Sequence, residues 1–191
     1  MDLFHRGRLS TVRGYGQRGF LVAADALQFA GALRDSIADI VFVDPPFNLG
    51  KDYGGATVLE NKSRVAYEIY MRHLFREVVR CLKPGGALFL YHIPYWASVF
   101  ASDLNERLEF RHWIAVAMKN GYVRGKNLYP AHYALLYYTK GKPRRFKRPR
   151  VPPSRCRHCN GMVKDYGGYT RFVQRGLNLR VAEEITPVNW A

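Results

Sequence analysis

The sequence has few cysteines and no long apolar run. Its 191 residues include only three cysteines, and it carries neither an apolar stretch of membrane-spanning length nor a recognisable secretory leader. A framework of disulfide bonds is therefore not expected, and neither is a membrane partner. Together these absences favour a reducing, cytoplasmic setting.

Acidic residues are also scarce. Asp and Glu number 15 against 30 Lys and Arg, so the formal net charge is +15 at pH 7. An excess of this size suits a polyanionic partner, of which nucleic acid is the simplest. The positive charge alone does not identify the partner, because ribosomal, RNA-binding and membrane-surface proteins are also strongly basic.

What the sequence does contain is an alternation of strand-like and helical segments, which is typical of α/β proteins. The 48% of apolar residues are sufficient for the core of one domain, alone or with a small appendage. Period and composition predict strands at residues 20–24, 40–43, 87–91, 112–118 and 132–139, and helices at 26–33, 65–82 and 94–108. The run Lys83-Pro84-Gly85-Gly86 is expected to end the second helix.

The most informative stretch is a strand that stops abruptly. An unbroken apolar run at residues 40–43, of the kind buried on both faces of a sheet, is followed by Asp44, Pro45 and Pro46. Proline removes a ladder donor and biases the preceding residue to extended geometry, so the strand cannot continue. The acid, the proline carbonyls and the ring of Phe47 are thereby presented at the carboxyl end of a strand, where open α/β sheets bind ligands.

The longer run around this acid resembles a known catalytic region. Asp44-Pro45-Pro46-Phe47-Asn48-Leu49-Gly50-Lys51-Asp52-Tyr53-Gly54 is similar to the motif of the permuted (β-class) S-adenosylmethionine-dependent DNA amino-methyltransferases, in which it comes early in the chain. The resemblance implies a partial class I methyltransferase (Rossmann-like) sheet, in which residues 112–118 and 132–139 form an antiparallel pair. It also implies restriction-modification methylation of DNA, or less readily RNA, and the leading acid resembles the adenine-N6 enzymes.

The chemistry of the reaction explains the residue types. The lone pair of an exocyclic base amine is delocalised into the ring, so a catalyst must accept hydrogen bonds from both N–H groups; the Asp44 carboxylate and the Pro45 carbonyl can do so. Pro46 stiffens the turn, and Phe47 offers an apolar face to a base that has left the stack. By the resemblance, the base pocket also includes Asn48, Lys51 and Tyr53. Transfer would be direct, because the chain has no Pro-Cys nucleophile. The alternative is an ordinary Asp capping a Pro-Pro turn.

A second acid is a candidate for the cofactor site. Asp25 ends the predicted strand at residues 20–24 and precedes Asp44 by 19 positions, which fits one strand–helix–strand repeat. The resemblance implies that Asp25, Ala26 and Asp44 lie near S-adenosylmethionine. Asp25 is equally well placed to be a helix N-cap, and the two roles are compatible.

Composition divides the chain into a basic N-terminal arm at residues 1–19, a core at 20–141 and a basic segment at 142–191. The resemblance implies that the core is an incomplete methyltransferase catalytic core, and that the last part is a linker with a target-recognition segment. The predicted phosphate contacts are Arg144, Arg145, Lys147, Arg148 and Arg150. Cys156 and Cys159 form one Cys-x-x-Cys pair, which is half of a structural zinc site or simply two free thiols, whereas Cys81 is read as a buried core thiol.

One expected motif is absent. The family's cofactor motif, a strand followed by a Gly-x-Gly turn, does not occur; Gly14-Tyr15-Gly16 has no predicted strand before it. A truncated product, one half of a split enzyme, and a non-catalytic DNA-binding descendant each account for this. We expect S-adenosylmethionine to bind weakly to this chain alone, and a second subunit or a second copy to complete the sheet.

Overall fold

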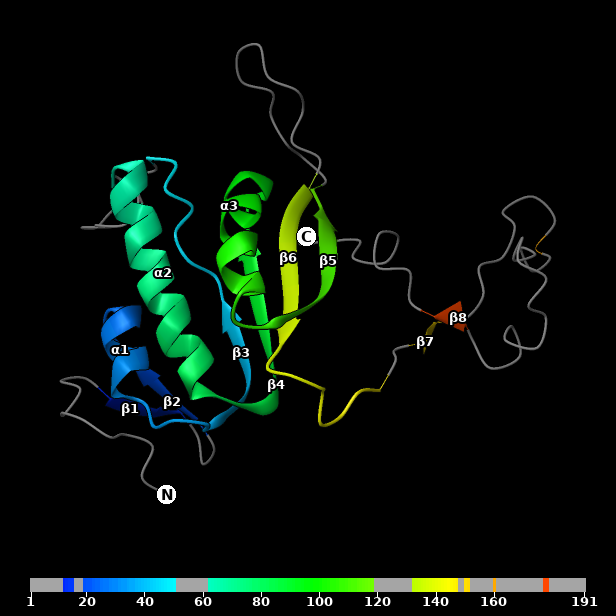
Figure 1. Ribbon diagram of the computed structural model, residues 1–191, viewed down its shortest axis with the longest axis horizontal. Coiled ribbons are helices and arrows are strands. Elements are labelled where there is room, and N and C mark those ends of the chain that lie inside the picture. Colours follow the sequence, from blue (N-terminus) through cyan, green and yellow to red (C-terminus); the bar gives the residue numbers. More distant parts are fainter. Residues whose placement is uncertain are drawn as a thin grey trace, which may run out of the picture.

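The computed structural model describes residues 12–15, 19–50, 62–118, 132–147, 150–151, 160 and 177–178 (Figure 1). In chain order, the elements are β1 (Val12–Tyr15), β2 (Gly19–Val22), α1 (Ala26–Ala32), β3 (Ala38–Val43), α2 (Arg64–Cys81), β4 (Leu82–His92), α3 (Pro94–Asn105), β5 (Glu109–Ala117), β6 (His132–Thr139), β7 (Arg150–Val151) and β8 (Leu177–Asn178).

Four of the strands form one open sheet. Its order is β3-β4-β6-β5; β3 runs parallel to β4, and β6 runs antiparallel to both of its neighbours. The register places Phe42 beside Phe89, and Phe89 beside Tyr137. The predicted α/β architecture with an antiparallel strand pair is confirmed, and the strand predicted at residues 132–139 coincides with β6.

A cap and an apolar stripe account for the long helix α2. The Ser63 hydroxyl accepts a hydrogen bond from the amide of Ala66 at 3.2 Å, which is an N-cap. The buried side chains recur every three or four residues and are Tyr67, Met71, Leu74, Phe75, Val78 and Cys81. These observations confirm the helix predicted at residues 65–82 and the burial of the Cys81 thiol. The helix ends at Cys81 and β4 begins at once, so the predicted turn residues lie inside the strand.

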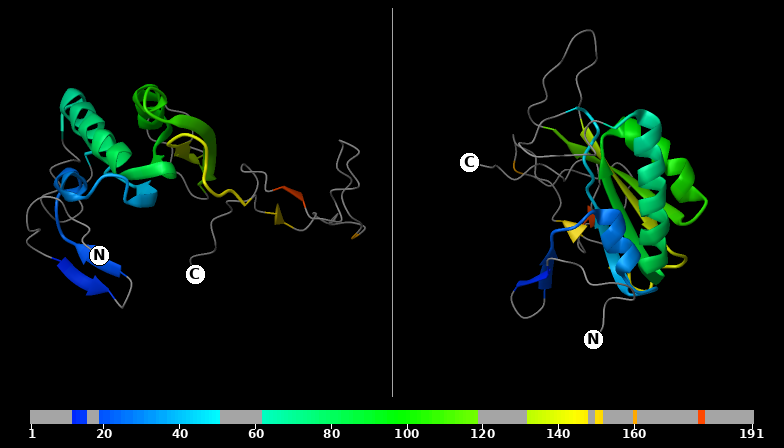
Figure 2. Two further views of the ribbon diagram at one scale, coloured as in Figure 1. Left: turned by 60° about the horizontal axis from the view of Figure 1, so that its bottom comes forward. Right: turned by 90° about the vertical axis from the view of Figure 1, so that its left-hand side faces the viewer.

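Helices α2 and α3 cover the same face of the sheet (Figures 1 and 2). The first residue of α3 is Pro94, a position where a missing N–H leaves no helical hydrogen bond unmade. The two helices and alternate residues of β4 and β6 bury one core, whose largest members include Tyr67, Phe75, Phe100, Leu88, Leu90, Leu136 and Tyr138. This core fixes the positions of the strand ends at which the candidate site lies.

The opposite face of β3 is exposed among the described residues. Ile40 and Phe42 retain 66% and 58% of their exposure, although the sequence predicts a strand buried on both faces. Because side chains alternate along a strand, Val41 and Val43 pack toward the helices while Ile40 and Phe42 point away from them. In the described sheet β3 is also an edge strand. This apolar edge is therefore a surface onto which another segment or chain can pack.

The segment predicted as a strand at residues 20–24 lies outside this sheet. β2 pairs antiparallel with β1 in a separate two-stranded sheet. The predicted strand–helix–strand repeat leading into β3 is therefore wrong. Spacing alone could not reveal this, since α1 separates β2 from β3 in either arrangement, and the pairing partner comes from within the predicted N-terminal arm.

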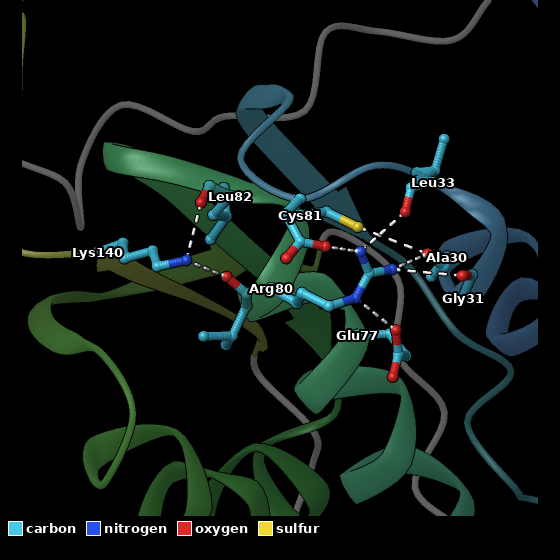
Figure 3. Close-up of polar contacts among 10 residues, drawn as sticks. Ala30, Gly31, Leu33, Glu77, Arg80, Cys81, Leu82 and Lys140 are labelled. Atoms are coloured by element: carbon cyan, nitrogen blue, oxygen red, sulfur yellow. Dashed lines mark hydrogen bonds and ion pairs between the residues drawn. The ribbon is translucent and has the colours of Figure 1, made fainter. Parts of the chain in front are cut away.

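A guanidinium group caps the carboxyl end of α1. Arg80 of α2 donates to the carbonyls of Ala30 and Leu33 at 2.9 and 2.8 Å (Figure 3). The same group forms ion pairs with Glu77, at 2.8 Å, and with Asp35. Helix ends leave carbonyls without intrahelical partners, and a cation there satisfies them. Arg80 thus ties the end of α1, and the chain that leads into β3, to α2.

An ammonium group caps α2 in the same way. Lys140, directly after β6, donates to the carbonyls of Val79 and Leu82 at 2.7 and 2.9 Å (Figure 3). The contact joins the carboxyl end of α2 to the end of β6, the strand that lies between β4 and β5.

Candidate active site

The acid-Pro-Pro-aromatic motif lies directly beyond the carboxyl end of β3. Asp44 follows the last residue of the strand and is exposed, whereas Pro45 is buried and Pro46 and Phe47 are half-buried. β4 runs parallel to β3, so its carboxyl end, with Tyr91 and His92, lies at the same edge of the sheet. A solvent-exposed acceptor therefore lies at the same edge as the half-buried rings of Phe47 and Tyr91 and the buried ring of His92.

Asp44 is the ionisable group at the centre of this edge. Its partial burial raises the pKa of the carboxyl above the ordinary aspartate value. The charge of Asp44 also affects Tyr91. The pKa of Tyr91 is raised to about 12, mainly by burial and to a smaller extent by the neighbouring Tyr133 and by Asp44. At neutral pH the Tyr91 hydroxyl thus remains a hydrogen-bond donor near the carboxylate.

The ring of Phe47 belongs to an aromatic cluster, made up of Phe47, Tyr91, His92 and Tyr133. The Phe47 ring centroid lies 4.9 Å from that of His92 at an interplanar angle of 30°, and 6.0 and 5.6 Å from those of Tyr91 and Tyr133. The Tyr91 and Tyr133 centroids are 5.2 Å apart. Rings at these separations attract one another, so the aromatic side chain of the motif has a defined position.

A chain of hydrogen bonds reaches the motif from α2. The Tyr67 hydroxyl donates to the carbonyl of Pro46 at 2.5 Å and lies 2.9 Å from Nε2 of His92. The backbone amide of Ile93 donates to Nδ1 of His92 at 2.9 Å. Tyr67 and His92 are both fully buried, and burial lowers the pKa of His92 to about 3. A buried, uncharged hydrogen-bond network therefore holds the motif from the side of the core.

Asn48, directly after the motif, is hydrogen-bonded to the backbone of Lys62. Its side-chain amide donates to the carbonyl of Lys62 at 3.0 Å, and its Oδ1 accepts from the amide of Lys62 at 3.1 Å. Asn48 has a φ of +53°, in the left-handed region that Asn tolerates better than most residues. In the described chain Asn48 thus contacts backbone. Lys51 and Tyr53, the other predicted pocket residues, lie outside the described residues.

Asp25 is the N-cap of α1. One of its carboxylate oxygens accepts from the amides of Leu27 and Gln28 at 3.0 and 3.1 Å, and the other accepts from the Tyr70 hydroxyl at 2.9 Å. The predicted capping role is confirmed, and Ala26 is the first residue of the helix. Tyr70 lies one helical turn from Tyr67, so the same end of α2 contacts both Asp25 and the motif.

The predicted phosphate contacts begin at the opposite end of β3. The amide of Arg144 donates to the carbonyl of Gly85 at 3.4 Å. The hydrogen bond from Lys83, and to a smaller extent the charges of Lys83 and Arg144, lower the pKa of Asp39. Gly85 has a φ of +75°, and a Cβ there would meet the Arg144 side chain at 2.5 Å, so only glycine fits. Arg145 and Lys147 are exposed. The side chains of Arg148 and Arg150 lie outside the described part of the chain.

The metal hypothesis rests on residues that the structure does not describe, since Cys156 and Cys159 fall in an undescribed range. In the ranges that are described, His, Cys, Asp and Glu side chains form no group of three or more that could hold a metal ion. None of the described helices is long and apolar enough to cross a membrane.

Sequence reasoning missed Tyr67, Tyr91, His92 and Tyr133. A signal existed for two of them: Tyr91 ends the strand predicted at residues 87–91 and His92 follows it, and a strand parallel to β3 must end at the same edge of the sheet as Asp44. Tyr133 becomes a neighbour only once the antiparallel register of β6 is known. Nothing in the helical period distinguishes Tyr67 from any other core residue of α2.

An open α/β sheet that presents this motif beyond its parallel strand has the architecture of the class I methyltransferases. The particular family follows from a comparison with family models: the chain belongs to the N6/N4 DNA methylase family, whose model matches residues 38–175.

Two curated relatives are type II methyltransferases. The chain is 41% identical over 177 residues to M.BamHI of Bacillus amyloliquefaciens, and 30% identical over 150 residues to M.HpaI of Haemophilus parainfluenzae. The two alignments include 91% and 74% of this chain but only 42% and 46% of the relatives. The chain thus spans less than half the length of the curated relatives it matches.

Among solved structures, the chain is similar to the PvuII DNA methyltransferase, which is described as cytosine-N4-specific. The TM-score is 0.48 at 18% identity, over 64% of this chain and 49% of the other.

Proposed function

We propose that this chain carries the amine-activating part of an S-adenosylmethionine-dependent DNA amino-methyltransferase. The observation that carries the proposal is the exposed Asp44 carboxylate at the carboxyl end of β3, which Pro45 follows in the chain and which lies near Tyr91 of the aromatic cluster. In the described part of the chain, an acceptor, a rigid turn and stacked rings meet at this edge. A flipped nucleobase presents the complementary features, an N–H donor and a planar ring.

Asp44 and Pro45 would act on the exocyclic amine. Hydrogen bonds from the two N–H groups to the carboxylate and to the carbonyl favour a pyramidal nitrogen, on which the lone pair is localised and nucleophilic. When the nitrogen gains the methyl group it sheds one proton, and the exposed Asp44 carboxylate gives that proton a route to solvent. Because partial burial raises the pKa of Asp44, methyl transfer should fall as the pH is lowered through a value above the ordinary aspartate range.

The residues at this edge fit S-adenosylmethionine on one side. Aromatic faces beside a carboxylate suit a cofactor that combines an adenine ring with a sulfonium cation, and Tyr91 and Tyr133 supply such faces. The cofactor would supply an electrophilic methyl group and leave as the neutral thioether. Asp25 and Ala26, at the start of α1, are the further candidates for its binding.

DNA is the proposed substrate, and the amine of adenine is the first candidate within it. The acid at the head of the motif favours adenine N6 by resemblance, while the matching family covers both N6 and N4 enzymes. The exposed Arg145 and Lys147 follow the core and suit phosphate contacts. RNA is the alternative polymer.

The test compares Asp44→Ala with Asp39→Asn, which changes an exposed acid at the other end of the same strand. Purified chain is incubated with labelled S-adenosylmethionine and duplex DNA or RNA, and the digested nucleosides are identified by mass spectrometry. Asp44→Ala should lower the rate by at least about 100-fold with folding retained, and Asp39→Asn should not. Recovery of N4-methylcytosine would correct the base assignment, while a wild-type rate in Asp44→Ala would remove the mechanism.

Calorimetry separates the enzyme from a non-catalytic DNA-binding protein on the same scaffold. The enzyme reading requires S-adenosylmethionine to bind, alone or in the presence of DNA. Binding of DNA with no cofactor heat under either condition would support the non-catalytic alternative.

A further inference from the structure

The hydrogen bonds around His92 have a single direction. The Ile93 amide can only donate, so Nδ1 of His92 must accept and its proton is on Nε2. Nε2–H then donates to the Tyr67 oxygen, and the Tyr67 hydroxyl proton is left for the carbonyl of Pro46. The order from donor to acceptor is Ile93, His92, Tyr67 and Pro46.

This direction does not reverse near neutral pH. His92 is fully buried, and burial lowers its pKa to about 3, so the ring stays neutral and keeps one donor and one acceptor. In the described residues around it, Tyr67 is the polar side chain that contacts the ring, while Phe47, Trp96 and Phe100 are its aromatic neighbours.

The network holds both sides of one peptide bond. The pyrrolidine ring fixes φ of Pro46, so the direction of its carbonyl determines where the chain continues. Tyr67 holds that carbonyl, and His92 stacks on the ring of the next residue, Phe47, at 4.9 Å. One buried pair thus restrains the main chain of the motif and its aromatic side chain together.

Packing alone does not explain the Tyr67 hydroxyl. The ring packs against Trp96 and Phe100, with centroids 4.8 and 6.0 Å away, and a phenylalanine would make the same contacts. Burying a hydroxyl without a partner is unfavourable, and here its partners are the motif carbonyl and His92.

We infer that Tyr67 and His92 are positioning residues for methyl transfer: through the Pro46–Phe47 peptide they hold the Asp44 carboxylate and the Pro45 carbonyl in the geometry that receives the base amine. This inference rests on the proposed function for its catalytic meaning. Its structural content, a motif ordered by a buried Tyr–His pair, can be measured in the chain without substrate.

The variants remove one hydrogen bond at a time. Tyr67→Phe deletes the donor to Pro46. His92→Asn keeps an acceptor for the Ile93 amide but has no group at the Nε2 position, whereas His92→Gln keeps the donor to Tyr67. The matched control is Tyr138→Phe, because Tyr138 is also fully buried and donates to Asn105 at 2.9 Å, but lies on β6 beside Leu88, away from the motif.

The first readout is nuclear magnetic resonance of the unliganded chain. We expect the wild-type His92 ring to show a protonated Nε2 and a bare Nδ1. We also expect Tyr67→Phe and His92→Asn to shift the Phe47 amide and speed its hydrogen exchange. His92→Gln should move it less, and Tyr138→Phe should leave it unchanged. A protonated Nδ1, or a Phe47 amide that responds no more to Tyr67→Phe than to Tyr138→Phe, would overturn the inference.

The second readout is steady-state methylation. Tyr67→Phe should lower kcat by roughly 10- to 100-fold with little change in KM, because misplacing a reacting group affects the transition state more than binding. The double variant Tyr67→Phe/His92→Asn should be no slower than the worse single variant. An unchanged kcat in Tyr67→Phe would overturn the inference. A wild-type chain that transfers no methyl group would instead count against the proposed function, and the resonance comparison would then decide the inference alone.

Discussion

The Lys140 ammonium lies 2.7 Å from the carbonyl oxygen of Val79, so the first cation after β6 is a helix cap. It also donates to Leu82. Lys140→Met leaves these two acceptors without their donor and should lower the free energy of unfolding by about 1–3 kcal/mol. The control is Lys142→Met, which removes the same charge from an exposed position. Urea unfolding of both variants measures the difference; equal midpoints would show that the Lys140 contact adds no stability.

Acid should destabilise the fold through His92. Its pKa is about 3 in the folded chain against about 6.5 in an unfolded one, so stability is complete above pH 6.5 and is lost as the pH falls toward 3. Between pH 6.5 and pH 5, one such group accounts for a loss of roughly 2 kcal/mol. We expect His92→Gln to flatten the pH dependence of unfolding in this window. The exposed His112, changed to Gln, serves as the control and should leave it intact. An unaltered slope in His92→Gln would contradict this account.

The basic segment after the core should bind DNA without reading its sequence. Changing Arg144, Arg145, Lys147 and Arg148 to Glu should weaken binding to all duplexes alike and flatten the salt dependence, since each lost phosphate contact reduces the slope by about one. Fluorescence anisotropy at several salt concentrations measures both effects. A change in preferred sequence would instead mean that these residues contact base edges.

A single reversal makes the sharper comparison. Arg145→Glu and Arg76→Glu alter the net charge equally, and both side chains are exposed, but Arg76 is on α2. If only general charge matters, the two variants will weaken DNA binding to the same extent.

The exposed edge of the sheet should associate. Ile40 and Phe42 are apolar and exposed on the strand that carries the motif, and Phe42 pairs with Phe89, which stacks on Tyr137 with centroids 4.8 Å apart. We therefore expect the purified chain to form an oligomer or to carry a second polypeptide, and the double variant Ile40→Ser/Phe42→Ser to lose it. Light scattering over a range of concentrations gives the mass of each species. A wild-type chain that stays monomeric and binds S-adenosylmethionine at micromolar levels would show that other residues of this chain replace the absent Gly-x-Gly cofactor motif.

Local pattern was sufficient for the strands of the four-stranded sheet and for the helices, but not for the short strands β1, β7 and β8. α2 and β6 have strong periods and clear ends, so they lie where their residues predict. The pairing of β2 was not predictable, because a seven-residue helix between two strands is compatible with more than one sheet. The exposure of Phe42 depends on what packs on β3, which an apolar run cannot report.

The contacts of Tyr67 and His92 with the motif also could not be predicted, but for a different reason. Tyr67 and His92 are 25 positions apart and meet only because α2 packs across the end of β4. A tyrosine in an apolar helical stripe looks like any other core residue until its hydroxyl is seen to contact a proline carbonyl. Buried polar partners of this kind belong to tertiary structure, whereas Asp44 and Phe47 are marked by the prolines between them.

Because two hydrogen bonds join Asn48 to Lys62, the position of the motif depends little on the number of residues between them. Both ends of that stretch are fastened to one another, so the entropy of closing it changes only with the logarithm of its length. Doubling the stretch would cost about 0.6 kcal/mol, little compared with the stability of a domain. An insertion between Asn48 and Lys62 should therefore leave Asp44 in place and cost little stability, as long as the two hydrogen bonds between these residues are kept.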